Sequence, residues 1–325
     1  MVTPPYSAAR LSRRDFLARA SLGLAAAYAL PRAFGAAADS NSSATASASN
    51  GAKRHFDIAG FEKHFFEKYS PAELAETFDE MNLDVELTVR PEGHVKPANA
   101  ADELPVLMAA LAARKRRIQT IATSFVRPDE PHIESTLRTA QKLGIRQYRH
   151  RGFSYVAGKP IKAQVADFRS QAREFAAINR QIGITALYQN HAGADAVGAA
   201  IWDIDSILDD IDPNLFGVAL DCRHLMVEQG RAWPTAIRLI SPRVRSLYVK
   251  SFRWDRDKTI ETPLSEGIVQ KELIDQVLAD HPNVPVCLHV EHLKLQPVPF
   301  AERASTVEAF RKDAAVLRGW LGATS

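Results

Sequence analysis

A regular alternation from His55 to the C-terminus constrains the fold most strongly: short apolar runs that end in polar residues are followed by longer helix-like segments. This alternation is typical of parallel strands joined by helices. Eight strands are expected, at 64–68, 83–90, 118–123, 145–149, 184–191, 216–221, 246–250 and 284–291. Helices are expected at 71–82, 104–115, 131–143, 163–182, 202–210, 233–240, 270–280 and 304–321.

Eight strand–helix units in about 270 residues match the size of a (β/α)8 barrel, in which chemistry collects at the C-terminal ends of the strands. A doubly wound open sheet is the alternative. No glycine-rich phosphate-binding pattern follows any expected strand, which disfavours a nucleotide-binding protein. We therefore predict an α/β fold, a single (β/α)8 TIM barrel over residues 55–325.

Residues 1–54 have a different character. Arg13 and Arg14 stand in the stretch SRRDFL, which is followed by a short apolar run and by small residues. This order is that of an export signal, and the arginine pair resembles the twin-arginine address. The apolar run is short of the roughly 20 residues that span a bilayer, so no permanent membrane span is expected. We predict a signal peptide over 1–38, a disordered linker over 39–54, and export to the periplasm by the twin-arginine machinery.

The formal net charge of +3 comes from this leader. The chain has 41 Lys plus Arg and 38 Asp plus Glu, and removal of the five Arg and one Asp of residues 1–38 leaves 36 basic and 37 acidic residues. A protein that binds nucleic acid would carry a basic groove. The near-neutral remainder predicts that nucleic acid is not a partner.

Titratable and metal-binding side chains stand at the ends of most expected strands. They are Glu86, Arg90 and the following His94; Arg149; Gln189, Asn190 and His191; Asp221 and the following His224; Lys250; and His289 with Glu291. Side chains two apart on a strand point to the same side, so a pair such as His289 and Glu291 could ligate a cation or act as an acid–base pair. A structural ion pair of Lys250 with Asp221 or Glu291 is the alternative.

Several stretches give the sequence from about 61 to 321 a specific resemblance. They are VELTVRPEGHV (85–95), YQNHAG (188–193), WDI (202–204), LDCRH (220–224), VKSFRW (249–254), PLSEG (263–267) and LHVEH (288–292). In order and spacing they resemble the sugar phosphate isomerase/epimerase group of the xylose isomerase-like TIM barrels.

The resemblance implies a metal site. Relatives with a complete site hold Mn²⁺, Mg²⁺, Co²⁺ or Zn²⁺ between a carboxylate on strand five, an Asp on strand six, a His on strand seven and a Glu on strand eight. Asp221 and Glu291 match two of these positions, whereas Gln189 and Tyr248 stand at the other two. The expected ligands of a divalent ion are therefore His191, Asp221, Glu291 and Gln189, with neutral groups that weaken affinity for hard cations.

The resemblance also implies a chemistry, the removal of a proton beside a carbonyl group to give an enediolate. We predict Glu291 as the base, with Glu86 as the second candidate, and His224 or His289 as proton donor or oxyanion partner. The predicted substrate-binding residues are Arg90, His94, Arg149, Asn190 and Lys250.

Export disfavours a phosphorylated substrate, because sugar phosphates are made and kept in the cytoplasm. We predict an isomerase or epimerase that acts on a free sugar, a keto-sugar or an oxidised glycoside. A lyase or hydratase of 3-keto-glycosides is a neighbouring alternative. A non-catalytic carbohydrate-binding barrel is another, favoured by Tyr248 at the position of the missing histidine. The sugar and the oligomeric state are not specified by the sequence.

Overall fold

The computed structural model describes residues 56–65, 69–293 and 296–322. The predicted signal peptide (1–38) and linker (39–54) lie outside the described residues and stay predictions. Among the described helices, none combines the length and the apolar character needed to cross a bilayer.

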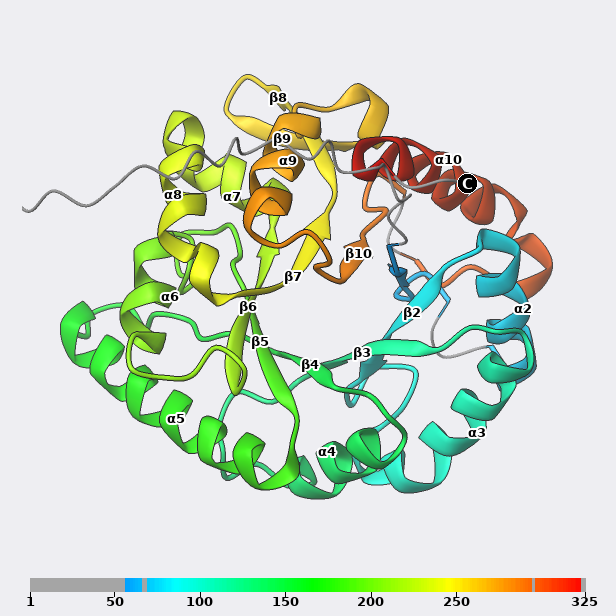
Figure 1. The fold of residues 1–325 in the computed structure, drawn as a ribbon, viewed down its shortest axis with the longest axis horizontal. Coiled ribbons are helices and arrows are strands. Elements are labelled where there is room, and N and C mark those ends of the chain that lie inside the picture. Colours follow the sequence, from blue (N-terminus) through cyan, green and yellow to red (C-terminus); the bar gives the residue numbers. More distant parts are fainter. Residues whose placement is uncertain (1–55, 66–68, 294–295, 323–325) are drawn as a thin grey trace, which may run out of the picture. The chain divides into compact units, whose positions relative to one another are not determined.

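Eight parallel strands close into a barrel (Figure 1). They are β1 (Ile58–Phe61), β2 (Asp84–Val89), β3 (Ile118–Thr123), β4 (Gln147–His150), β5 (Thr185–Gln189), β6 (Phe216–Asp221), β7 (Val244–Val249) and β10 (Val286–Leu288). The order around the ring is β1-β10-β7-β6-β5-β4-β3-β2, so β1 closes the ring between β2 and β10. The predicted (β/α)8 barrel is confirmed.

Helices surround the strands on the outside of the ring (Figure 1). They are α2 (Pro71–Met81), α3 (Ala100–Ala113), α4 (Ile133–Lys142), α5 (Ile161–Ile182), α6 (Ile201–Leu208), α7 (Cys222–Gln229), α8 (Trp233–Ile240), α9 (Lys271–Asp280) and α10 (Ala304–Leu321). Short 3-10 turns lie at Pro97–Asn99, Gly230–Ala232, Ser241–Arg243, Leu264–Glu266 and Phe300–Glu302. Helix α2 shows how the sequence sets a boundary: Ser70 and Glu73 form a reciprocal capping box at its start.

The barrel separates two layers of packing. Val85, Leu87 and Val89 of β2 belong to the large apolar cluster that includes the helices. The alternate residue Glu86 points inward, because side chains on a strand alternate between its two sides. A smaller inner cluster holds Phe61, Tyr248 and Leu187 together with three alanines and Cys287. The barrel is therefore filled below its mouth, as expected for an eight-stranded ring.

The expected first strand at 64–68 is wrong, because the structure places it at Ile58–Phe61. The sequence there, Ile-Ala-Gly-Phe, is four residues long and fully buried, so it shows neither alternation nor a long apolar run. A further hairpin of β8 (Ser251–Asp255) and β9 (Lys258–Thr262) lies outside the ring order and was not expected. The same is true of α7, which begins directly after β6.

Gly60 tests the corrected first strand. A Cβ added there would lie 3.2–3.3 Å from side-chain atoms of Leu83, Phe78 and Phe310. Gly60→Val should therefore lower the free energy of unfolding by about 1–3 kcal/mol through overpacking. Gly319→Ala, in helix α10 with open space around its Cα, is the matched control and should be neutral or slightly stabilising. Urea denaturation measures both, and equal stability of Gly60→Val and the wild type would contradict the assignment.

Candidate functional site

The C-terminal ends of the strands surround a cavity of about 500 Å³. Seven of the predicted site residues line it: Arg90, Arg149, Gln189, His191, Lys250, His289 and Glu291. The other five, Glu86, His94, Asn190, Asp221 and His224, are not among the lining residues. The mouth of the barrel therefore brings together most, but not all, of the side chains that the sequence singled out.

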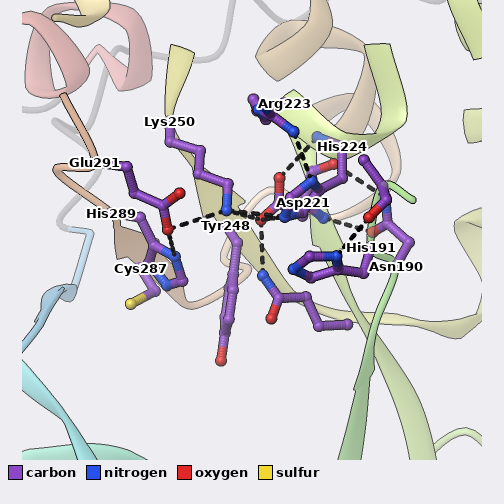
Figure 2. A network of polar contacts seen from close by, with 12 residues as sticks. Asn190, His191, Asp221, Arg223, His224, Tyr248, Lys250, Cys287, His289 and Glu291 are labelled. Atoms are coloured by element: carbon purple, nitrogen blue, oxygen red, sulfur yellow. Dashed lines mark hydrogen bonds and ion pairs between the residues drawn. The ribbon is translucent and has the colours of Figure 1, made fainter. Parts of the chain in front are cut away.

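The Lys250 ammonium group lies at the centre of this site (Figure 2). Its Nζ is 3.2 Å from Asp221 Oδ2, 3.2 Å from Glu291 Oε1 and 3.0 Å from His224 Nε2. The lysine side chain is 3% exposed. Burial alone would lower the pKa of Lys250, but the two carboxylates outweigh it and raise that pKa above its usual range. The ammonium group is therefore charged and lies within 3.2 Å of two carboxylate oxygens and one imidazole nitrogen.

Asp221 is fixed by its place between a strand and a helix. It is the last residue of β6 and the N-cap of α7, where its Oδ1 accepts a hydrogen bond from the backbone N–H of His224 at 3.0 Å. Asn190 holds the same position from β5: its Oδ1 accepts from the Asp221 N–H at 2.7 Å, and its Nδ2 donates to the Asp221 carbonyl at 3.1 Å. Asn190 thus joins two strand ends instead of lining the cavity.

Glu291 follows β10 and has two lysine partners. Lys63 Nζ lies 2.6 Å from Glu291 Oε1, in addition to the 3.2 Å contact of Lys250. Burial raises the pKa of Glu291, but Lys250, the His289 ring with its Nδ1 at 3.6 Å, and Lys63 together hold that pKa well below its usual range. Glu291 is therefore an ionised carboxylate that lines the cavity.

A second polar layer lies around Glu86. Its Oε1 accepts from the Tyr248 hydroxyl at 2.8 Å and lies 3.1 Å from Arg149 Nε, and its Oε2 contacts Cys287 Sγ at 3.1 Å and His289 Nε2 at 2.9 Å. Burial raises the pKa of Glu86, but Arg149 and His289 outweigh it and hold that pKa far below its usual range. Glu86 is an ionised, fully buried anchor and does not face the cavity.

The predicted metal ligands do not fit a divalent ion in this arrangement. Lys250 contacts the oxygens of Asp221 and Glu291 that would face such an ion. Gln189 accepts from Arg149 through Oε1 at 2.6 Å and donates to Asp221 through Nε2 at 2.7 Å, so its amide oxygen is already engaged. His191 donates a hydrogen bond from Nδ1 to the Ala192 carbonyl at 2.8 Å. In this tautomer the Nε2 nitrogen carries the lone pair that a metal ion would bind.

Among the residues that the structure describes, one group of His, Cys, Asp or Glu side chains has three potential ligand atoms within 4.8 Å of one another, and it is not the predicted one: Glu86, Cys287 and His289. Burial and Glu86 raise the pKa of the Cys287 thiol well above its usual range, whereas a metal ligand needs the thiolate. Arg149 already neutralises Glu86 at 3.1 Å. This group is arranged as a hydrogen-bond network instead of a metal site.

Two predicted histidines are neutral. Burial lowers the pKa of His224 to about 2, although Asp221 opposes the shift. Its two ring nitrogens contact Lys250 at 3.0 Å and Arg223 at 3.1 Å. Burial likewise lowers the pKa of His94 to about 4, and its backbone N–H donates to Thr88 Oγ1 at 2.8 Å. Roles for both in binding or proton transfer stay predictions.

Sequence reasoning missed Lys63, Phe61 and Arg151, all of which line the cavity. The Phe61 ring stacks against the Arg149 guanidinium, 4.6 Å from the ring centroid. Phe61 and Lys63 were missed because the first strand was placed too late in the chain. The stretch Phe-Glu-Lys at 61–63 would have stood out as the polar end of a correctly placed strand.

Comparison with known proteins gives the following likenesses. The profile of the family described as "Xylose isomerase-like TIM barrel" matches residues 131–318. A 3-keto-D-glucoside 4-epimerase from E. coli superposes with a TM-score of 0.61 at 13% identity, covering 82% of this chain and 100% of that chain. A D-tagatose 3-epimerase-like protein has a TM-score of 0.63 at 15% identity and coverages of 82% and 97%.

A xylose isomerase-like TIM barrel protein from Mycobacterium smegmatis, in complex with magnesium, has a TM-score of 0.58 at 15% identity and coverages of 79% and 97%. No curated protein sequence matches the chain at a significant level. At these low identities the structural likeness concerns the fold.

Glu62, which follows β1, connects this strand end to Thr88 of β2, a residue that lines the cavity. Its Oε1 accepts from the backbone N–H of Thr88 at 2.6 Å and from the Thr88 hydroxyl, whereas its buried Oε2 has no hydrogen-bond partner among the described residues. Burial raises the pKa of Glu62 to about 7, against the lowering effect of Thr88 and Arg90. Folded Glu62 therefore keeps a proton in a pH range where the unfolded chain has released it.

The extra proton on folded Glu62 predicts the direction in which the free energy of unfolding changes with pH. Between the unfolded pKa of 4.5 and the folded pKa of about 7, stability should fall as pH rises, because the folded state binds the extra proton. Glu62→Gln removes this titration, so its stability relative to wild type should rise by about 3 kcal/mol across that interval. Urea unfolding of both proteins from pH 4.5 to pH 8 measures the difference. Parallel stability curves would contradict a raised pKa at Glu62.

Proposed function

The chain belongs to the xylose isomerase-like TIM barrel family, and from this premise we propose that it is a sugar-modifying enzyme. Its reaction is the isomerisation or epimerisation of a free sugar, a keto-sugar or an oxidised glycoside through removal of a proton beside a carbonyl group. One observation carries the proposal: an ionised carboxylate, Glu291, and an ammonium group, Lys250, lie 3.2 Å apart and line the same cavity.

The pair supplies the two groups that the step needs. Glu291 takes the proton from the carbon beside the carbonyl. The electron pair of the C–H bond forms a carbon–carbon double bond, and the π pair of the carbonyl group moves to its oxygen. Lys250 donates a hydrogen bond to that oxygen and stabilises the enediolate. Return of the proton to the other face of the carbon gives the epimer. Return to the neighbouring carbon, with proton exchange between the two oxygens, gives the isomer.

Substrate binding also raises the basicity of Glu291. Two lysines hold Glu291 ionised and weakly basic in the free site. A substrate carbonyl that accepts a hydrogen bond from Lys250 replaces part of the contact between Lys250 and Glu291. The carboxylate then becomes more basic at the moment when the C–H bond becomes more acidic. Mn²⁺, Mg²⁺, Co²⁺ or Zn²⁺ is not required, because Lys250 serves as the electrophile.

The surroundings favour a carbohydrate with more than one ring. The cavity of about 500 Å³ is of the size that holds a small polar ligand. An adjoining cavity of about 530 Å³ shares Arg151, Gln189 and His191 with it and includes Phe168 and Gln171 in its lining. This second space would take the remaining part of a glycoside, which supports an oxidised glycoside over a free monosaccharide.

Two alternatives use the same site. Elimination from, or hydration of, a 3-keto-glycoside begins with the same enolate and differs only in the fate of the neighbouring substituent. A non-catalytic carbohydrate-binding barrel is favoured by the double lysine contact of Glu291, which lowers its basicity. Product analysis separates the first alternative from epimerisation, and the absence of any proton exchange would favour the second.

Proton exchange with solvent tests the function directly. Purified protein is incubated in D₂O with free ketoses and with 3-keto-glucosides, and loss of the carbon-bound proton beside the carbonyl is followed by NMR. We expect exchange with the glycosides, and a loss of at least about 1000-fold in Glu291→Gln, which removes the general base.

Glu92→Gln is the matched control, since Glu92 lines the same cavity without an ion pair to Lys250 among the described residues. It should retain exchange within about tenfold. Circular dichroism and the melting temperature check that the variants are folded. Equal exchange rates in Glu291→Gln and wild type would contradict the proposal.

We also propose that the protein works outside the cytoplasm after export by the twin-arginine machinery. The support is the sequence SRRDFL with its following apolar and small residues. A periplasmic site suits a substrate without phosphate.

Replacement of the arginine pair tests the export route. The double variant Arg13→Lys, Arg14→Lys should retain the protein in the cytoplasm, because the export receptor reads the arginine pair as an address. Cell fractionation with immunoblotting measures its location. The wild type should reach the periplasm, and periplasmic accumulation of the double variant would contradict twin-arginine export.

A further inference from the structure

Three acceptor atoms from three different parts of the barrel converge on one nitrogen. Asp221 Oδ2 comes from the end of β6, His224 Nε2 from the first turn of α7, and Glu291 Oε1 from the segment after β10, and all lie 3.0–3.2 Å from Lys250 Nζ. Two carboxylate oxygens and an imidazole nitrogen are donors of the kind that bind divalent ions. Here they surround an ammonium group (Figure 2).

The local charge is already balanced. Asp221 and Glu291 contribute two negative charges, and Lys250 and Lys63 contribute two positive charges within 3.2 Å of them. A divalent ion added beside these lysines would leave two uncompensated positive charges in a buried site, where repulsion between like charges is strong.

The residues at the two other expected ligand positions are engaged elsewhere. Gln189 bridges Arg149 and Asp221 with its amide group. The Tyr248 hydroxyl donates to Glu86 at 2.8 Å, away from Lys250; Figure 2 shows its ring pointing away from the ammonium group. Neither side chain therefore offers a free oxygen toward Asp221 and Glu291.

We propose that the Lys250 ammonium group takes the place of a divalent metal ion between Asp221 and Glu291. The protein is then independent of metals, and Lys250 is the residue that keeps them out. Removal of the amine would leave Asp221 Oδ2, Glu291 Oε1 and His224 Nε2 around the position of Nζ, each now 3.0–3.2 Å from it, so that small side-chain shifts would bring them to metal-ligand distance. The His191 ring lies beside them, 4.0 Å from that of His224. Lys250→Ala should create a divalent metal site.

The experiment measures metal binding and not turnover. The full-length protein is produced with a tag that lacks histidine, in medium supplemented with MnCl₂ and ZnCl₂, and its metal content is determined by mass spectrometry. We expect far less than one ion per wild-type chain and no change of melting temperature with EDTA. A wild-type protein with one tightly held ion, whose removal lowers the melting temperature, would overturn the proposal.

Metal binding by variants at Lys250 is the second part of the experiment. Calorimetric titration of Lys250→Ala with ZnCl₂ or MnCl₂ should give about one site per chain with at least a hundredfold higher affinity than wild type. Excess metal should also raise its melting temperature by on the order of 5 °C. Lys63→Ala is the matched control: it removes a cation from Glu291 but leaves Lys250 in place, so it should gain no comparable affinity.

The proposal stays falsifiable if Lys250→Ala folds poorly. Lys250→Met keeps an apolar stem but is one atom shorter, so it leaves the position of Nζ vacant and should show the same gain. The metal content of the wild type does not depend on any variant. A Lys250→Met protein that is folded and binds no metal would overturn the proposal. Because no measurement involves a sugar, its failure is distinct from failure of the proposed function.

Discussion

Two carboxylates at the mouth of the barrel, Asp221 and Glu291, share the Lys250 ammonium group that lies between them, and Glu291 has a second partner in Lys63. A buried carboxylate without a partner is strongly destabilising. Lys250 compensates both, and its own burial is compensated by them and by His224. The arrangement requires that β6, β7 and β10 end at the same level, which the closed parallel ring imposes through its register. Removal of this one amine would alter charge, packing and chemistry together.

The other polar groups of the barrel extend this network through one ion pair and two hydrogen bonds. Arg149 lies between Glu86 and Gln189, and Gln189 in turn donates to Asp221. A chain of contacts therefore connects the inner network around Glu86 with the carboxylates at the mouth. In the proposed reaction the base would be held in position by this network before substrate arrives, which is the condition for effective electrostatic catalysis.

The sequence predicted the barrel because seven of the eight expected strands, such as Phe216–Asp221, coincide with apolar or alternating runs in the ring. The fully buried first strand has four residues and no periodic pattern, so Lys63 could not be placed at the site. The sequence also predicted that Asp221, Lys250 and Glu291 lie together at the mouth of the barrel. It did not determine whether an ion or an ammonium group lies between them, because that depends on side-chain reach across three strands. The catalytic and binding roles of these residues stay predictions.

A crystal structure of the protein grown in MnCl₂, with diffraction measured at a wavelength where manganese scatters anomalously, tests the central claim most directly. The account predicts Lys250 Nζ within hydrogen-bond distance of Asp221 and Glu291, and no anomalous peak between them. An anomalous peak coordinated by these two carboxylates, with Lys250 turned away, would contradict it.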